Sequence, residues 1–144
     1  METEYGHVLV YGVTEALTEA FDFSSINVPL ATVLGAAAEH GAVAAPAHPG
    51  RPKVGMFAHT DELGIPEGIC IVETLNGGSR DDEDQIAKDG AAANGYQGIG
   101  GSDSHIVSHI GRCGTRFENP FQTIDDLVQE LNGGQFEAVS LTEA

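Results

Sequence analysis

The sequence predicts an α/β fold, because short apolar strands alternate with amphipathic helices along the chain. Residues 6–12, GHVLVYG, are rich in β-branched and aromatic residues between glycines, which predicts a buried strand. Thr14 then offers a helix N-cap before a run with apolar residues on one face. Such alternation is typical of βαβ units, so we expect a mainly parallel sheet or barrel, with ligands at the carboxyl ends of its strands.

The later elements follow from the same signals. Pro29 opens a helix and Gly41 closes it, acidic residues begin the helix at 81–94, and Thr123 with Asp126 forms a capping pair. Further strands are expected at 42–47, 69–75, 98–102 and 136–141, and further helices at 27–41, 81–94 and 123–133.

The length of the chain and its 41% hydrophobic residues fit one domain over residues 1–144. It has no apolar run long enough to cross a bilayer and no secretory leader at Met1, so we expect a cytoplasmic protein. Cys70 and Cys113 form no CxxC pair, which argues against a zinc knuckle or a disulfide framework and favours two buried thiols.

The chain is strongly acidic, with 22 acidic against 6 basic residues and a formal charge of -16. Such a field repels nucleic-acid phosphates and anionic membranes, so neither is an expected partner. Lysine is confined to Lys53 and Lys88, a balance that resembles proteins adapted to strong salt, where screening weakens self-repulsion.

Polar residues follow several of the expected strands. Asp103 and His105, in GGSDSH, are two apart, so both side chains leave one face of an extended segment and form a natural pair of metal ligands. An equally weighted alternative is a turn in which Asp103 caps the next segment and His105 is solvated. His48, in AHPGR, is placed at the end of a strand by the proline and glycine that follow it.

Two further candidates lie within strands. His7, in GHVL, would by itself be a structural histidine. Glu73, in VETLNG, could be a ligand, a partner of a histidine or an exposed carboxylate, and we favour a supporting or structural role.

In order, the segments GHVLVYG, AHPGR, VETLNG and GGSDSHIVSHIG resemble the later motifs of polymerase-and-histidinol-phosphatase (PHP) domains, over nearly the whole chain. The resemblance implies a distorted (β/α)7 barrel, of which this chain holds the later strands and helices. It also implies hydrolysis of phosphate esters with up to three divalent metal ions, commonly zinc, manganese or iron. The ions generate hydroxide from water and neutralise the phosphate oxygens.

Carried over by position, the metal ligands would be His7 and His48 for one ion, and Asp103 and His105 for others, with the latter two also catalytic. Glu73 matches a position near the barrel rim that is not usually a ligand. The remaining histidines match no ligand position and are expected at the surface or in structural roles: His40, His59 and His109.

The family's opening motifs, an HxH pair and a later His-Asp, have no counterpart here, so we expect fewer than three ions. The bridging glutamate would fall at or before Met1, and Glu2 or Glu4 could replace it only with a register shift. This pattern predicts a barrel that lacks its N-terminal motifs. An open barrel edge must be covered, so we expect a homo-oligomer or a segment that completes the barrel.

All arginines of the chain lie in or closely after these motifs: Arg51, Arg80, Arg112 and Arg116. Some are expected to bind a substrate phosphate, Arg51 foremost and Arg112 with it; the alternative is pairing with surface carboxylates. The main hypothesis is therefore a metal-dependent phosphoesterase acting on a small phosphate ester. The alternatives are a non-catalytic PHP-like interaction or regulatory module, similar to the ribonuclease P subunit with such a barrel, and a small-molecule-binding domain without metal.

Overall fold

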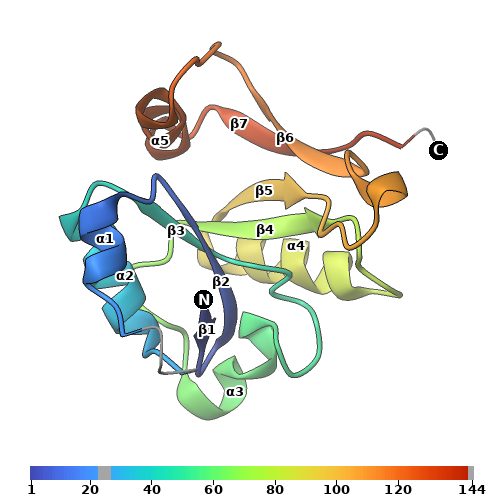
Figure 1. Cartoon of the computed structure of the whole chain (residues 1–144). Helices are drawn as coiled ribbons and strands as arrows, with labels where there is room; N and C mark the ends of the chain where they lie inside the picture. The colour runs from blue at the N-terminus through green and yellow to red at the C-terminus, as the bar shows by residue number, and fades with distance from the viewer. Residues whose placement is uncertain (23–26, 143–144) are drawn as a thin grey trace.

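The computed structural model describes residues 1–22 and 27–142 and shows a mixed α/β protein, which confirms the α/β class but not the partial PHP-like barrel (Figure 1). The strands are β1 (Glu2–Thr3), β2 (Gly6–Tyr11), β3 (Val43–Pro46), β4 (Ile71–Asn76), β5 (Gln97–Gly101), β6 (Cys113–Phe117) and β7 (Phe136–Ser140). The helices are α1 (Glu15–Glu19), α2 (Leu30–Glu39), α3 (Thr60–Leu63), α4 (Glu83–Asn94) and α5 (Ile124–Gly133). Two short 3-10 turns are η1 (Met56–Ala58) and η2 (Val107–His109).

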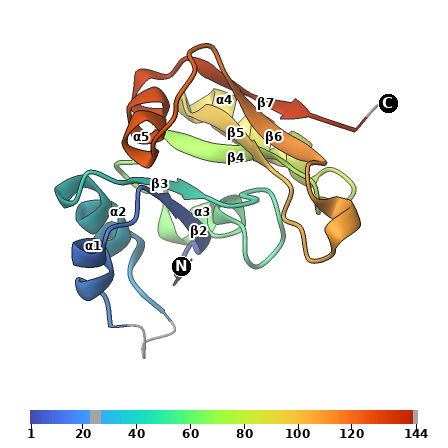
Figure 2. The ribbon, with the colours of Figure 1, turned by 45° about the horizontal axis from the view of Figure 1, so that its top comes forward.

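The strands form three small sheets: β1-β2-β3 and β6-β7 are antiparallel, and β4-β5 is parallel. The expectation of a mainly parallel sheet is therefore wrong. After β2 the chain forms α1 and α2 at one end of the sheet and returns beside β2 in the opposite direction, as Figures 1 and 2 show. Within the described residues the sheets do not close into a barrel.

The predicted strands and helices lie within a few residues of observed ones, but the sequence had predicted neither the short elements β1 and α3 nor the strand β6. Its sequence CGTRF has neither a β-branched run nor strict alternation. It forms because β7 pairs with it antiparallel, and Thr115 bonds across to β5 by donating to the Gly100 carbonyl and accepting from the Gly100 amide, both at 3.0 Å.

The core consists of two apolar clusters. One joins β2, α2, η1 and β4 through residues that are almost fully buried: Val8, Leu30, Val33, Met56 and Val72. The other lies between β3, β4, β5 and α5: Val43, Ala45, Ile71, Ile99 and Leu131. Since β4 contributes to both clusters, it is the strand around which the rest packs, with α4 along one side and the β6-β7 pair on the other (Figure 1).

Both cysteines are free, but the expectation that they are buried is wrong. Cys70 is exposed because its neighbours Ile69 and Ile71 point into the core, and alternation turns Cys70 outward. Cys113 is half-buried at the start of β6. None of the described helices is long and apolar enough to span a bilayer.

The loop after β3 packs directly on the first turn of α4. A Cβ atom added to Gly50 would lie 2.0 Å from the Glu83 carbonyl oxygen and 3.0 Å from the Ala87 amide nitrogen. Only glycine permits this approach, which brings the segment after His48 against α4.

We predict that Gly50→Ala destabilises the fold by about 2 kcal/mol or more, because both clashing atoms belong to helix backbone. Gly35→Ala is the matched control, since Gly35 lies inside α2 with no atom within 4 Å of its added Cβ. It should stabilise by up to about 1 kcal/mol through helix propensity. Urea unfolding measures both; equal stability of the two variants would contradict the close packing.

Candidate functional site

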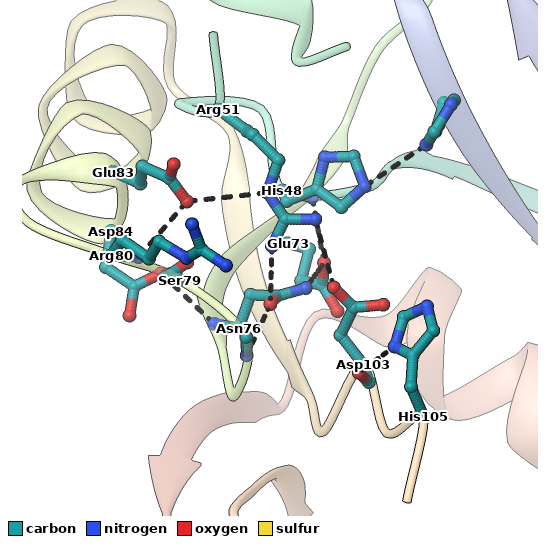
Figure 3. Close-up of polar contacts among 12 residues, drawn as sticks. His48, Arg51, Glu73, Asn76, Ser79, Arg80, Glu83, Asp84, Asp103 and His105 are labelled. Atoms are coloured by element: carbon teal, nitrogen blue, oxygen red, sulfur yellow. Dashed lines mark hydrogen bonds and ion pairs between the residues drawn. The ribbon is translucent and has the colours of Figure 1, made fainter.

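The predicted site residues lie around two neighbouring hollows that share Asp103. The first hollow, of about 560 Å³, is bordered by His7, His48, Glu73, Asn76 and Asp103. The second, of about 600 Å³, is bordered by Asp103, His105, His109 and the arginines Arg51, Arg80 and Arg112. His48 and His105 therefore face the same region of the fold from either side of Asp103 (Figure 3).

The two imidazoles of the first hollow face each other. His7, from β2, places its Nδ1 atom 3.3 Å from Nε2 of His48, with the rings 5.1 Å apart in an edge arrangement. His48 lies two residues after β3 ends at Pro46 and adopts a left-handed φ of 31°. It is only 7% exposed, so its ring is fixed by packing.

His48 is held in its neutral form. Burial lowers its pKa below the ordinary 6.5, and the nearby charges of Arg51 and His7 lower it further. Its Nδ1 atom is buried and has no hydrogen-bond partner among the described residues. A neutral imidazole keeps a free lone pair, the form in which histidine binds metals.

Glu73, near the middle of β4, lies beneath His48. Its Oε2 atom accepts hydrogen bonds at 2.8 Å from both the His48 backbone amide and the Asn76 side-chain amide. Gly101 on β5 makes room for it, since a Cβ there would lie 2.4 Å from Glu73 Oε1. Burial raises the pKa of Glu73, and the bonds from Asn76 and His48 oppose that rise. Glu73 therefore contacts His48 through the backbone amide of that histidine and not through its imidazole ring.

Asn76 connects this buried carboxylate to Arg51 (Figure 3). The Asn76 Oδ1 atom accepts from Arg51 Nη2 at 3.1 Å and from the Gly78 amide at 2.8 Å. Arg51 also donates from Nη1 to Asp103 Oδ2 at 3.0 Å and from Nε to Glu83 Oε2 at 3.4 Å. One hydrogen-bonded chain therefore runs from the His48 loop to the end of β5.

Asp103 and His105 do not lie on one extended segment, as the sequence had suggested. Asp103 comes after the end of β5 and has a left-handed φ of 46°, so the chain turns there. His105 is exposed, and its Nδ1 atom contacts the Asp103 carbonyl at 2.9 Å. This is close to the alternative of a turn with a solvated histidine, and it separates the two side chains: only Asp103 borders the first hollow.

The Asp103 carboxylate is ionised and paired with Arg51. Burial acts to raise its pKa, but the hydrogen bond and charge of Arg51, with His48 and His105 adding to them, lower it below its usual range. Tyr11 borders the same hollow, and burial together with the charge of Glu73 raises the pKa of its hydroxyl to about 12, so it stays protonated.

Within the described residues, no group of three or more His, Cys, Asp or Glu side chains is arranged to hold a metal ion. The facing nitrogens of His7 and His48 fit two ligands of a divalent cation, and the buried Nδ1 of His48 would then carry the ring proton. Glu2 pairs with His7 across β1 and β2 and borders the hollow, whereas Glu4 accepts from the Leu30 amide at 2.8 Å and so begins α2. The residues present therefore fit part of a metal site.

Of the residues that border the second hollow, the sequence had assigned His109 to the surface or to a structural role, and had named Arg80 only as one of several arginines that could bind phosphate. His109 lies four residues after His105, and because η2 turns the chain between them, both side chains border the second hollow. Arg80 follows the VETLNG motif by three residues, and its position could be recognised only once β4 and α4 were placed.

Residues 83–136 match a family model described as PHP-associated. The later part of this chain is thus similar to a PHP-associated region. The match begins at α4 and ends at the start of β7, so it includes Asp103, His105 and Arg112, while His7 and His48 precede it. No curated protein and no solved structure matches the chain.

We predict that acid destabilises the chelator-treated protein partly through His48. Its folded pKa lies below the unfolded value of 6.5, so the unfolded state binds more protons as the pH falls through 6.5, and stability is lost. His48→Gln should therefore lose less unfolding free energy between about pH 7.5 and 5.5 than the wild type. The control His40→Gln, at the end of α2, should lose as much unfolding free energy as the wild type. The same pH dependence of stability in all three proteins would refute a buried neutral imidazole at His48.

Proposed function

We propose that this chain forms part of a metal-dependent phosphoesterase site of the PHP type, acting on a small phosphate ester. The observation that carries the proposal is the pair of facing imidazoles, His7 and His48, held beside the Arg51–Asp103 ion pair by one buried network. Imidazoles suit a divalent cation, and a guanidinium suits a phosphate. The α/β elements described above would then be the later strands and helices of an incomplete barrel.

In this proposal His7 and His48 hold a zinc, manganese or iron ion, and the chain holds fewer ions than the family's three. Asp103 and Glu2 border the same hollow and would offer carboxylates as further ligands. Such an ion, when bound, would lower the pKa of water and offset charge on the phosphate oxygens. Because the described residues supply only part of its coordination, we derive no reaction step through it.

The remaining roles fall to residues at the junction of the hollows. Arg51 would bind phosphate oxygens bidentately, and Arg112 would approach the substrate from the second hollow. His105 is exposed at that rim, where its imidazole can give a proton to the leaving oxygen.

A partner that completes the site is part of the proposal. Within the described residues β1 pairs with no strand besides β2, and its Glu2 carbonyl already accepts from the Val28 amide at 3.1 Å. An apolar hollow of about 300 Å³ lies over β2 and α1, bordered by Val10, Val13 and Leu17 among others. A second copy of the chain, or a further segment, would cover this hollow, so light scattering at micromolar concentration should show self-association; a monomer would count against it.

A non-catalytic PHP-like module remains the second candidate, and a specific observation favours it. Asp103 is committed to Arg51, and the described residues contain no group of three ligands. A site that had lost its metal would be expected to satisfy its carboxylates internally in this way.

We predict that the metal-free protein binds zinc or manganese, and that His7→Ala and His48→Ala each weaken this binding about tenfold or more. Hydrolysis of p-nitrophenyl phosphate should require the metal and vanish in His48→Ala. The control is His40→Ala, which changes a histidine outside both hollows. Calorimetry and elemental analysis measure uptake; absence of stoichiometric metal would reject the hydrolase and favour the module.

A further inference from the structure

Positive charge is scarce in this protein, yet it is concentrated at the second hollow. The chain has 6 basic against 22 acidic residues, and three of its four arginines, Arg51, Arg80 and Arg112, border this one space. The fourth, Arg116, lies on β6 and pairs with the exposed Glu137, with Nε 3.0 Å from Oε1.

Two of these arginines lack internal partners. Arg51 is paired with Glu83, Asp103 and Asn76. The guanidinium groups of Arg80 and Arg112, by contrast, make no hydrogen bond or ion pair with any residue that the structure describes. In so acidic a protein, arginines normally find a carboxylate, so two unpaired guanidiniums in one hollow indicate a site for an external anion.

The carboxylates of the hollow do not neutralise Arg80 and Arg112. Glu83 Oε2 accepts from Arg51 Nε and from the Arg80 backbone amide at 3.2 Å, and Asp103 Oδ2 accepts from Arg51 Nη1. Both acids are thus directed at the Arg51 guanidinium. The charge of the other two guanidiniums remains available.

The turn after β4 is built for close approach. A Cβ on Gly77 would lie 2.6 Å from the Ser102 carbonyl oxygen and 3.0 Å from Arg112 Cβ, so glycine is required for Arg112 to reach this wall. A Cβ on Gly78 would lie 3.0 Å from Asp103 Oδ2 and 3.4 Å from Arg51 Nη2. The absence of side chains here keeps the space between the arginines open.

We infer that the second hollow binds a phosphate group through Arg80 and Arg112, independently of any metal. Arginine forks match the oxygens of a tetrahedral oxyanion, and the ligand is either free phosphate or a phosphate ester. The inference goes beyond the proposed function, since it holds equally for an enzyme and for a non-catalytic module.

The test uses the full chain with EDTA present, so that failure of the metal site cannot affect it. Inorganic phosphate and phenyl phosphate are titrated separately by calorimetry at low ionic strength. We expect saturable binding that weakens about tenfold or more in Arg80→Gln and in Arg112→Gln. Arg116→Gln removes the same charge outside the hollow and should bind as the wild type does.

The two probes distinguish the source of the phosphate: tighter binding of phenyl phosphate identifies an ester as the ligand, and tighter binding of the inorganic ion identifies free phosphate. Thermal unfolding of each variant verifies that it is folded, and Arg80 is exposed enough to be replaced without disturbing the core. Absence of saturable binding, or an equal loss in Arg116→Gln, would overturn the inference.

Discussion

The arrangement of both hollows depends on one buried carboxylate, that of Glu73. It is 4% exposed on the central strand β4, and its Oε2 atom accepts from the His48 amide and the Asn76 side chain. A buried carboxylate is costly unless hydrogen bonds satisfy it, so the fold must keep both donors in place. The left-handed turn at His48 and the absence of a side chain at Gly101 follow from that requirement.

The same network makes the two hollows interdependent. Asn76 receives Arg51 on its Oδ1 atom while it donates to Glu73, and Arg51 in turn holds Asp103. The charge of Arg51 contributes to lowering the pKa of both His48 and Asp103, so one guanidinium favours a neutral imidazole on one side and an ionised carboxylate on the other. A ligand that binds Arg51 or Asp103 would therefore alter both hollows.

Much of this could be predicted from the sequence because the signals are local. Proline and glycine after His48 fix it at a strand end, and the caps at Thr14 and Thr123 define where helices begin. Strand direction could not be predicted, since the helices between β2 and β3 return the chain antiparallel, and that depends on packing. The left-handed conformation of Asp103 and the convergence of Arg80 with Arg112 are likewise tertiary effects.

The central claim is that Glu73 and Arg51 belong to one cooperative network through Asn76, and a double-mutant cycle tests it most directly. Unfolding free energies of Glu73→Gln, Arg51→Gln and the double variant would be measured by urea denaturation. Because Glu73→Gln removes the charge at constant side-chain size and Arg51→Gln removes the guanidinium, each change weakens the network, and we expect an interaction energy of about 0.5–3 kcal/mol. Additivity to within about 0.3 kcal/mol would show that the two residues act separately and would contradict the account.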